Sequence, residues 1–530
     1  MDKEPVRLAT FGFGQQNILP AEEFGNKAAG LATMATLGIP VPSGFSLSVA
    51  LCREYFEGQR TLPPETPQLI SQGITFLERA TGTVFGGERR PLLVSVRSGS
   101  PVSMPGIMDT ILNVGLTSVS VHGMIAKSGS PRFAYDTYRR FLENFGVCVF
   151  NHDKQEYYRL LQNALQEEDL ADERELDFLS LRTLCSEYAS LYVTDEERSC
   201  LTDARRQLEC AFGAVLNTWM NIRAVEYRRL HSIDESIGTA ITVQAMVFGN
   251  FSATSGSGVA FTRNPWTGIK ELLIDFRFAS QGEDVVSGAR SAITQAELAE
   301  LLPDVYREIL QIGARLEEHY RDMQDLEFTV QEGRLFILQC RTGKRSPLAE
   351  LRIVVELCEG GIIGRQELLE RVKKIPVESL ELQTVLSDSP PIAYGISASG
   401  GVAQGSIAFS VERAVLDSQT GPVILVRETA TPDDIAGIVV SAGILTARGA
   451  RTSHAAVVAR HRGKVCVVNC TDLNIEPAQH RCTIKDISFH EGDILSLDGN
   501  SGAVFKGPVQ VIRQLPEDLL EKVRQWKFTA

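Results

Sequence analysis

The sequence predicts a multidomain protein that combines α/β and α+β architecture, and three observations support this. The chain has 530 residues, which corresponds to about three domains of ordinary size. Its apolar residues follow helical spacing in some segments and form strand-like runs in others. After a polar, proline-containing stretch at 386–391, the chain becomes rich in Gly, Val, Ile and Ala. We therefore expect a second, compact α/β domain after this linker.

The part of the chain before the linker alternates between helical and strand-like segments. In order, we expect a helix at 25–37, a buried strand at 91–97, helices over 132–231, strands at 241–248 and 257–262, a hairpin over 325–341, and exposed helices over 346–377. The strand at 91–97 runs directly into a loop at 98–106 that is rich in Gly, Ser, Pro and Met.

The part after the linker is dominated by short apolar segments. We expect strands at VILVRE (423–428), GIVVS (437–441), CVVNC (466–470) and ILSLDG (494–499), and a final helix at 516–526. A zinc site at Cys466 and Cys470 would need two further ligands, and Cys466 lies within an apolar run. We therefore interpret these two residues, like the other eight of the ten cysteines, as reduced core thiols.

Composition excludes several classes of protein. Hydrophobic residues make up 43% and charged residues 22%, which is typical of a folded globular chain. No apolar run approaches the ~20 residues that span a bilayer, and the charged N-terminus does not resemble a secretory signal. The net charge of −13 repels nucleic-acid phosphates. We expect a cytoplasmic protein that binds neither membrane nor nucleic acid.

The segment 443–460 carries the strongest chemical signal. An apolar strand ends there in a Gly-containing loop, and Thr452 or Ser453 can cap a helix that begins at His454. The positive end of the helix dipole keeps the imidazole neutral and nucleophilic. Backbone N–H groups of the first turn can bind phosphoryl oxygens, and Arg448 and Arg451 add positive charge. Without further context, a capped helix with a structural histidine is the better interpretation.

Wider sequence context favours the chemical interpretation. The run TARGARTSHAAVVAR at 446–460 resembles the phosphohistidine motif of the pyruvate phosphate dikinase family, among the enzymes that make or use phosphoenolpyruvate. A Gly-Met pair of the family pattern is Ala450-Arg451 here. Further segments similar to this family follow in family order at 24–31, 93–106, 243–250, 258–265, 281–286, 323–345, 463–468, 491–493 and 498–499.

The resemblance implies an ATP-grasp-type nucleotide domain followed by a swivelling phosphohistidine domain. The expected limits are 1–345 for the ATP-grasp domain with a helical insertion at about 132–235, 346–392 for a helical segment and linker, 393–510 for the mobile phosphohistidine domain, and 511–530 for a C-terminal helical tail. The family's large (β/α) barrel, which binds pyruvate, has no counterpart here. We therefore expect that the chain cannot make phosphoenolpyruvate alone.

The resemblance also implies the site residues. Lys27 and Arg97 would meet the ATP phosphates, with Arg139 or Arg140 as a weaker candidate. The nucleotide-binding residues would be Lys27, Arg97, Gly106, Met108, Ser257, Asp284, Glu327, Gln339 and Arg341. The metal ligands would be Asp325, Glu327 and Gln339, and the catalytic residues His454, Arg97 and Arg341.

One detail of this site stays open on the sequence alone. Asp325 and Glu327 alternate on one face of a strand, as do Gln339 and Arg341 on the returning strand. A two-residue turn at Glu332-Gly333 would put these pairs on opposite faces, whereas a longer loop or a bulge would bring them together.

Two departures from the family pattern are small. Ser257 stands where the family has Thr, which keeps the hydroxyl, and Asp275 stands where it has Glu. We expect Asp275 to lie on a structural strand.

The implied activity is that of a phosphotransferase with paired acceptors. ATP, inorganic phosphate and His454 would give AMP, pyrophosphate and phosphohistidine, with Mg²⁺ as cofactor and a monovalent cation as a further candidate. The phosphoryl acceptor, a small molecule or a separate barrel protein, is not identified by the sequence, and neither is the oligomeric state. Two alternatives remain: part of a full dikinase, or a non-catalytic nucleotide-binding regulatory module supported only by Ala450-Arg451.

Overall fold

A computed structural model describes residues 6–102, 104, 108, 110–281, 293–376, 380, 382–387, 389–449, 451, 454–476 and 479–528. The chain divides into two compact units, which we describe separately. Unit 1 comprises Met1–Val247 and Phe336–Gln339, and unit 2 comprises Phe248–Leu335 and Cys340–Ala530. Among the described residues, no helix combines the length and the apolar character that crossing a bilayer requires.

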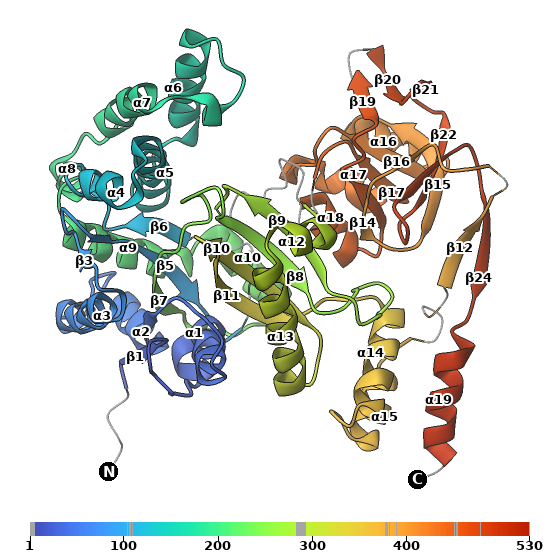
Figure 1. Ribbon diagram of the computed structural model, residues 1–530, viewed down its shortest axis with the longest axis horizontal. Coiled ribbons are helices and arrows are strands. Elements are labelled where there is room, and N and C mark those ends of the chain that lie inside the picture. The colour runs from blue at the N-terminus through green and yellow to red at the C-terminus, as the bar shows by residue number, and fades with distance from the viewer. Residues whose placement is uncertain are drawn as a thin grey trace. The chain divides into compact units, whose positions relative to one another are not determined.

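Unit 1 is built on a five-stranded antiparallel sheet with the order β1-β2-β7-β5-β6. The strands are β1 (Leu8–Phe11), β2 (Gly44–Leu47), β5 (Val94–Gly99), β6 (Thr110–Val114) and β7 (Ala240–Ala245), with a small parallel pair, β3 (Val84–Phe85) and β4 (Pro91–Leu92). Three helices accompany the sheet: α1 (Ala21–Thr36), α2 (Val49–Glu57) and α3 (Thr66–Thr81) (Figure 1). The predicted first helix and the strands at 91–97 and 241–248 are confirmed.

The predicted helical stretch in unit 1 is confirmed. Its helices are α4 (Ser120–Ser128), α5 (Pro131–Phe150), α6 (Lys154–Glu167), α7 (Phe178–Ser190), α8 (Asp195–Cys200), α9 (Ala204–Thr218) and α10 (Ile222–Leu230). The Arg139 guanidinium is buried among them and pairs with Asp136 and Glu173 at 3.1 and 3.2 Å. These contacts give Arg139 a structural role in the insertion, which weakens it as a phosphate-binding candidate. Arg140 pairs with the same two acids.

Unit 2 begins with a four-stranded sheet of order β11-β10-β8-β9. Its elements are β8 (Gly256–Phe261), β9 (Leu273–Phe278), β10 (Gln324–Gln331) and β11 (Arg334–Thr342), with α12 (Gln295–Leu301) and α13 (Pro303–Tyr320). The predicted hairpin is confirmed, with a two-residue turn in which Glu332 and Gly333 have φ of 51° and 75°. Positive φ at both central residues matches the right-handed twist of a hairpin.

A connecting region follows this sheet. It consists of α14 (Pro347–Glu359), α15 (Arg365–Val372), β12 (Leu382–Leu386), β24 (Gln510–Gln514) and α19 (Glu517–Phe528). Helices at 346–377 and 516–526 are confirmed, but the prediction that the former are exposed is wrong for α14, where Leu351 and Val354 are buried in one cluster with Leu519 and Val523 of α19. The sequence missed this because the partner helix lies about 160 residues further along the chain.

β12 and β24 form a two-stranded antiparallel ribbon (Figure 1). One strand leads into the C-terminal α/β domain and the other leads out of it.

The C-terminal α/β domain, β13 to β23, is a three-layered structure around an eight-stranded mixed sheet. The sheet order is β13-β23-β22-β15-β16-β17-β18-β14, and β15 to β18 are parallel. The strands are β13 (Ala393–Tyr394), β14 (Ile396–Ser399), β15 (Val402–Ala408), β16 (Val423–Arg427), β17 (Gly443–Thr446), β18 (Val465–Val468), β22 (Ile494–Asp498) and β23 (Ala503–Lys506).

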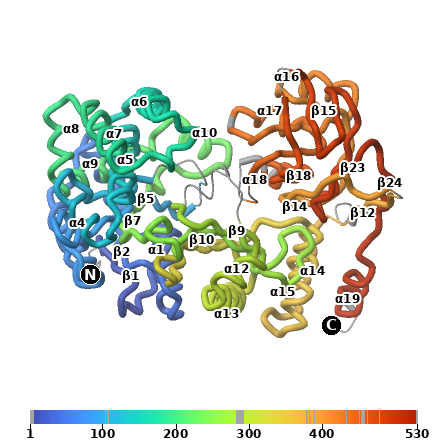
Figure 2. Tube along the Cα trace, turned by 45° about the horizontal axis from the view of Figure 1, so that its top comes forward, coloured from blue at the N-terminus to red at the C-terminus, as the bar shows by residue number. Residues whose placement is uncertain are grey.

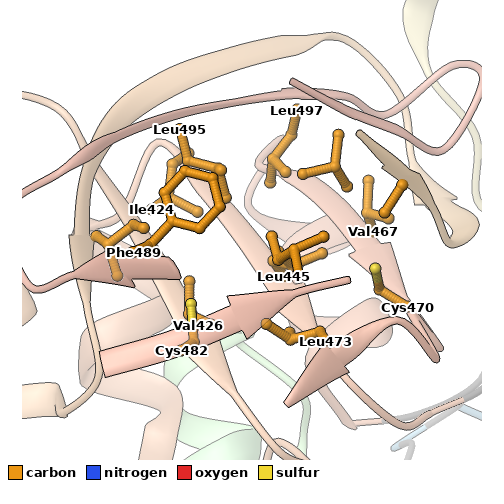
Figure 3. Packing of buried hydrophobic residues seen from close by; sticks show 14 of the residues in the cluster. Ile424, Val426, Leu445, Val467, Cys470, Leu473, Cys482, Phe489, Leu495 and Leu497 are labelled. Atoms are coloured by element: carbon orange, nitrogen blue, oxygen red, sulfur yellow. The ribbon is translucent and has the colours of Figure 1, made fainter. Parts of the chain in front are cut away.

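The two faces of this sheet are covered differently. One face packs against a small sheet of β19 (Leu473–Glu476), β20 (Arg481–Ile484) and β21 (Ile487–His490), where Figure 3 shows Phe489 and Leu473 near Val426 and Leu445. The other face packs against α16 (Val411–Asp417), α17 (Ile435–Val440) and α18 (His454–His461). Cys466 and Cys470 are buried on these two faces, and burial raises the pKa of their thiols to about 12 and about 11.

Three of the four predicted strands of this domain are confirmed, and one is wrong. The segment GIVVS, predicted as a strand, forms most of α17 (Ile435–Val440). Because β16 and β17 are parallel, the chain must cross over between them, and a helix is the usual crossover. The β-branched residues of the segment are typical of strands, and the need for a crossover is not visible in the local sequence.

The α14–α19 packing generates a stability prediction. Leu519 is 2% exposed, so Leu519→Ala should remove a filled core position and lower the free energy of unfolding of unit 2 by about 2–4 kcal/mol. Leu515→Ala, at a residue 46% exposed, should change it by less than about 0.5 kcal/mol. Urea unfolding of both variants checks this. Equal effects would mean that α19 does not pack stably against α14.

Candidate functional site

One group of predicted site residues lies in unit 1, where the start of α1 meets the end of β5. Gly25 interrupts the helix with φ 77°, and a Cβ there would lie 1.8 Å from the Gly99 carbonyl oxygen. Beside it, the Asn26 N–H donates to the Ser100 carbonyl at 3.3 Å. This glycine therefore lets the helix touch the backbone of the predicted phosphate loop.

The same junction brings two predicted phosphate-binding residues to one place. Lys27 Nζ donates to the carbonyl of Ser98 at 3.2 Å, and Ser98 directly follows Arg97 on β5. Both cations therefore lie at the carboxyl end of β5, where the loop begins. Met108 is half-buried, whereas Gly106 lies outside the described residues.

Unit 2 carries a separate group of predicted site residues, a carboxylate face on its four-stranded sheet. Glu327 of β10 pairs with Val259 of β8, which pairs with Asp275 of β9. Directly paired residues point to the same face of a sheet, so Glu327, Asp325 and Asp275 share one face.

Arg341 joins this face. Its Nε lies 2.8 Å from Asp325 Oδ2, and its Nη2 lies 3.7 Å from Glu327 Oε1. The two-residue turn alone does not explain this contact, which forms near the open end of the hairpin, one residue before β11 ends. Gln339, which was predicted as a metal ligand, belongs to unit 1. We therefore do not place it in the cluster of Asp325, Glu327 and Arg341.

Burial and charge act against each other on this face. Burial raises the pKa of Asp325, and Arg341 opposes that shift. Burial also lowers the pKa of Lys344, and the positive charges of Arg341 and Arg460 lower it further. The cluster therefore combines a carboxylate that is costly to ionise with a surplus of positive charge.

Ser257 lies farther along the same face, opposite Thr329. Its hydroxyl is buried and lies 3.0 Å from the Ser280 carbonyl and 3.1 Å from the Thr329 hydroxyl. The hydroxyl is thus engaged within the sheet. Asp284 lies outside the described residues.

His454 is the first residue of α18, which follows β17 in the C-terminal α/β domain. The predicted helix start is therefore confirmed. Figure 2 shows α18 beside β18, and β14 pairs with β18. The predicted caps Thr452 and Ser453, together with Ala450, lie outside the described residues.

Arg451 connects the His454 loop to the carboxylate face. Its Nη1 lies 2.9 Å from Asp275 Oδ1, and its backbone N–H donates to Asp275 Oδ2 at 2.8 Å. Asp275 therefore lies on a strand, as predicted, and it also binds a loop that is far away in sequence.

Arg460, at the other end of α18, is a site residue that the sequence analysis missed. Its Nη2 donates to the Arg451 carbonyl at 2.7 Å, and its guanidinium carbon lies 5.2 and 5.1 Å from the rings of Phe261 and Trp266. Burial lowers its pKa. The available signal was an arginine that ends an otherwise apolar helical run.

The carboxylates fit a divalent cation that accompanies a polyphosphate. Mg²⁺ in nucleotide sites is usually held by one or two carboxylates plus substrate phosphates. Asp325 and Glu327 supply two hard oxygen donors, and the burial of Asp325 makes a cation favourable beside it. The described residues contain no group of three or more His, Cys, Asp or Glu that could hold a metal ion.

Comparison with known proteins decides the family. The family model "Pyruvate phosphate dikinase, AMP/ATP-binding domain" matches residues 58–297 and 290–356, and "PEP-utilising enzyme, mobile domain" matches 419–502. The first of these covers more than half of the chain. The chain belongs to the pyruvate phosphate dikinase family. The predicted resemblance and fold class are thereby confirmed.

Curated dikinases are similar over nearly the whole chain. The chain is 40% identical to the pyruvate, phosphate dikinase of Rhizobium meliloti over 98% of its length and 60% of that protein. The chain is 40% identical to the chloroplastic dikinase of Flaveria trinervia over 99% of its own length and 56% of that protein. It is 38% identical to the dikinase of Clostridium symbiosum over 97% of its own length and 60% of that protein. The chain thus spans less than two thirds of these relatives.

The close contact at Gly25 generates a prediction with a matched control. Gly25→Ala should strain the α1–β5 junction, because the added Cβ meets backbone and φ is positive. We expect a loss of at least about 3 kcal/mol in stability, or failure to fold. Gly30→Ala in the same helix meets no atom within 4 Å and should stabilise the protein by up to about 1 kcal/mol. Thermal unfolding of both variants checks this, and a harmless Gly25→Ala would contradict it.

Burial of Asp325 generates a prediction about pH. Its folded pKa lies above the ordinary value of 3.8, so the folded protein binds this proton more tightly than the unfolded chain. Ionisation therefore weakens the folded state as the pH rises through these two values. Asp325→Asn should be more stable than the wild type at pH 7, with a smaller difference at pH 3.

Urea unfolding at the two pH values measures this difference. A variant less stable than wild type at pH 7 would show that the Arg341 ion pair outweighs the cost of burial.

Proposed function

We propose that this chain is an ATP- and phosphate-dependent phosphotransferase that phosphorylates its own His454 and passes the phosphoryl group to an external acceptor. The observation that carries the proposal is the link from the His454 loop to the carboxylate face. Arg451, three residues before the histidine, pairs with Asp275 on the face that carries Asp325 and Glu327. The domain limits given above, 1–345, 346–392, 393–510 and 511–530, are part of this proposal and are supported by the two matched regions.

Each group has a role that follows from its position. Lys27 and Arg97, at the mouth of the loop after β5, would offset the negative charge of the ATP phosphates. Asp325 and Glu327 would hold the Mg²⁺ that accompanies the nucleotide, and bound Mg²⁺ would neutralise phosphate charge. Arg341 occupies the cation position beside Asp325 in the ligand-free chain and would turn to the phosphates when a metal-bound nucleotide arrives.

The reaction has two balanced steps. An imidazole nitrogen of His454 attacks the β-phosphorus of ATP, the bond from that phosphorus to the oxygen bridging the α- and β-phosphates breaks, and AMP leaves with that oxygen. An oxygen of inorganic phosphate then attacks the terminal phosphorus of the pyrophosphoryl-histidine, which leaves phosphohistidine and releases pyrophosphate. Positioning and electrostatic stabilisation supply most of the catalysis in such transfers.

Two kinds of phosphoryl acceptor are compatible with the proposed reaction. The relatives are named for pyruvate and phosphate, and the chain spans 56–60% of their length. We propose that the acceptor is a small molecule or a separate barrel protein that docks with the C-terminal α/β domain. A cytoplasmic location and a monovalent cation remain predictions.

Labelling tests the proposed activity. The protein is incubated with Mg²⁺, phosphate and ATP labelled at the β-position, with His454→Ala as control. We expect acid-labile, alkali-stable label on the wild type alone, because a phosphoramidate nitrogen is protonated and cleaved in acid. AMP and pyrophosphate should appear in equal amounts, and His454→Ala should still bind ATP.

The contrary result is equally clear. A wild type that binds ATP but takes no label would exclude the phosphotransferase and leave a nucleotide-binding regulatory module. Label retained by His454→Ala would place the phosphoryl group on another residue.

A further inference from the structure

We propose that Arg451 and Asp275 are a pair of positioning residues that seat the His454 loop on the nucleotide-binding sheet. The inference rests on the proposed function and deepens it. The two residues lie 176 positions apart in the chain and meet in one contact.

The contact has two hydrogen bonds of fixed direction. Arg451 Nη1 donates to Asp275 Oδ1 at 2.9 Å, and the Arg451 backbone N–H donates to Oδ2 at 2.8 Å. A carboxylate held by both a side chain and a main chain fixes the loop backbone itself, not only the end of a flexible side chain. The next described residue in the chain is His454, at the start of α18.

Other contacts hold Arg451 in this orientation. Its Nε donates to the Ser397 carbonyl at 3.2 Å, and its own carbonyl accepts from Arg460 Nη2 at 2.7 Å. Arg460 in turn stacks against Phe261 and Trp266 of the nucleotide-binding lobe. The arginine is therefore held from the C-terminal α/β domain on one side and from β9 on the other.

Burial of the Asp275–Arg451 ion pair makes the loss of either residue costly. The Asp275 side chain is 3% exposed and that of Arg451 is 18% exposed. A charge removed from water is costly when its partner is absent, so losing either residue leaves an uncompensated charge in the contact. We therefore expect the loop to be held on the sheet only when both Arg451 and Asp275 are present.

The Asp275–Arg451 pair lies on the same face of the sheet as the carboxylates that would bind the metal. Asp275 and Glu327 are separated by one strand, β8, on the same face, which corresponds to about 10 Å between the two strands. The seat thus places the loop beside the carboxylates that would hold the metal and nucleotide. The Arg451 backbone N–H, Nη1 and Nε are engaged by Asp275 and Ser397, so we assign Arg451 to holding the loop.

A double-mutant cycle tests the pair in the full chain. Arg451→Met, Asp275→Ala and the double variant are compared by the single-turnover rate of His454 labelling and by ATP affinity. We expect each single variant to label at least tenfold more slowly, ATP affinity to change less than twofold, and the double variant to be no slower than the slower single variant. Arg413→Met is the matched control, because Arg413 pairs only with Asp417 on the surface of α16 among the contacts described.

A second measurement does not depend on catalysis. The Arg451 amide hydrogen should exchange slowly in the wild type and in Arg413→Met, and at least tenfold faster in Asp275→Ala. Multiplicative slowing in the double variant, or an unchanged amide in Asp275→Ala, would overturn the inference.

The two proposals can fail separately. If the wild type takes no label, the phosphotransferase fails, and amide exchange alone decides whether Asp275 seats the loop. If the wild type is labelled and the pair variants label normally, the seat fails and the phosphotransferase stands.

Discussion

Negative charge gathered on one face of a sheet is the constraint on which unit 2 depends. Asp275, Asp325 and Glu327 all point to this face, and a carboxylate withdrawn from water needs compensation. Three arginines supply it, one from the same hairpin and two from the domain that carries His454. They are Arg341, Arg451 and Arg460.

Under the proposed function, this arrangement would link nucleotide binding to the placement of His454 through electrostatics. Arg341 is held by the acids that would also bind the metal, so a metal-bound nucleotide competes with an internal cation. Arg451 instead pairs with another acid, Asp275, which also accepts from the loop backbone. On this face Arg341 pairs with Asp325, and Arg451 pairs with Asp275.

The sequence predicted the parts of the fold that local pattern determines. Strand β5 and the start of α18 at His454 follow from apolar runs and a loop at the expected places. The burial of α14 and the helical state of the GIVVS segment did not follow, because both depend on a distant partner or on the direction of neighbouring strands. The family resemblance pointed to Arg451 and to Asp275 as departures at separate places in the chain. Their relation is visible only where the chain brings them together.

The paired strands β12 and β24 have a consequence for motion of the C-terminal α/β domain. Five residues of each strand are joined in register, so a swing of the domain must bend or twist both strands together. A domain attached by a single flexible strand could move in all directions. A domain attached by a two-stranded ribbon, which resists stretching, would move mainly along an arc. The search for a docking position then becomes close to one-dimensional. A nucleophile carried along an arc returns to the same place far more often than one on a loose tether, which raises its effective concentration there without any additional contact.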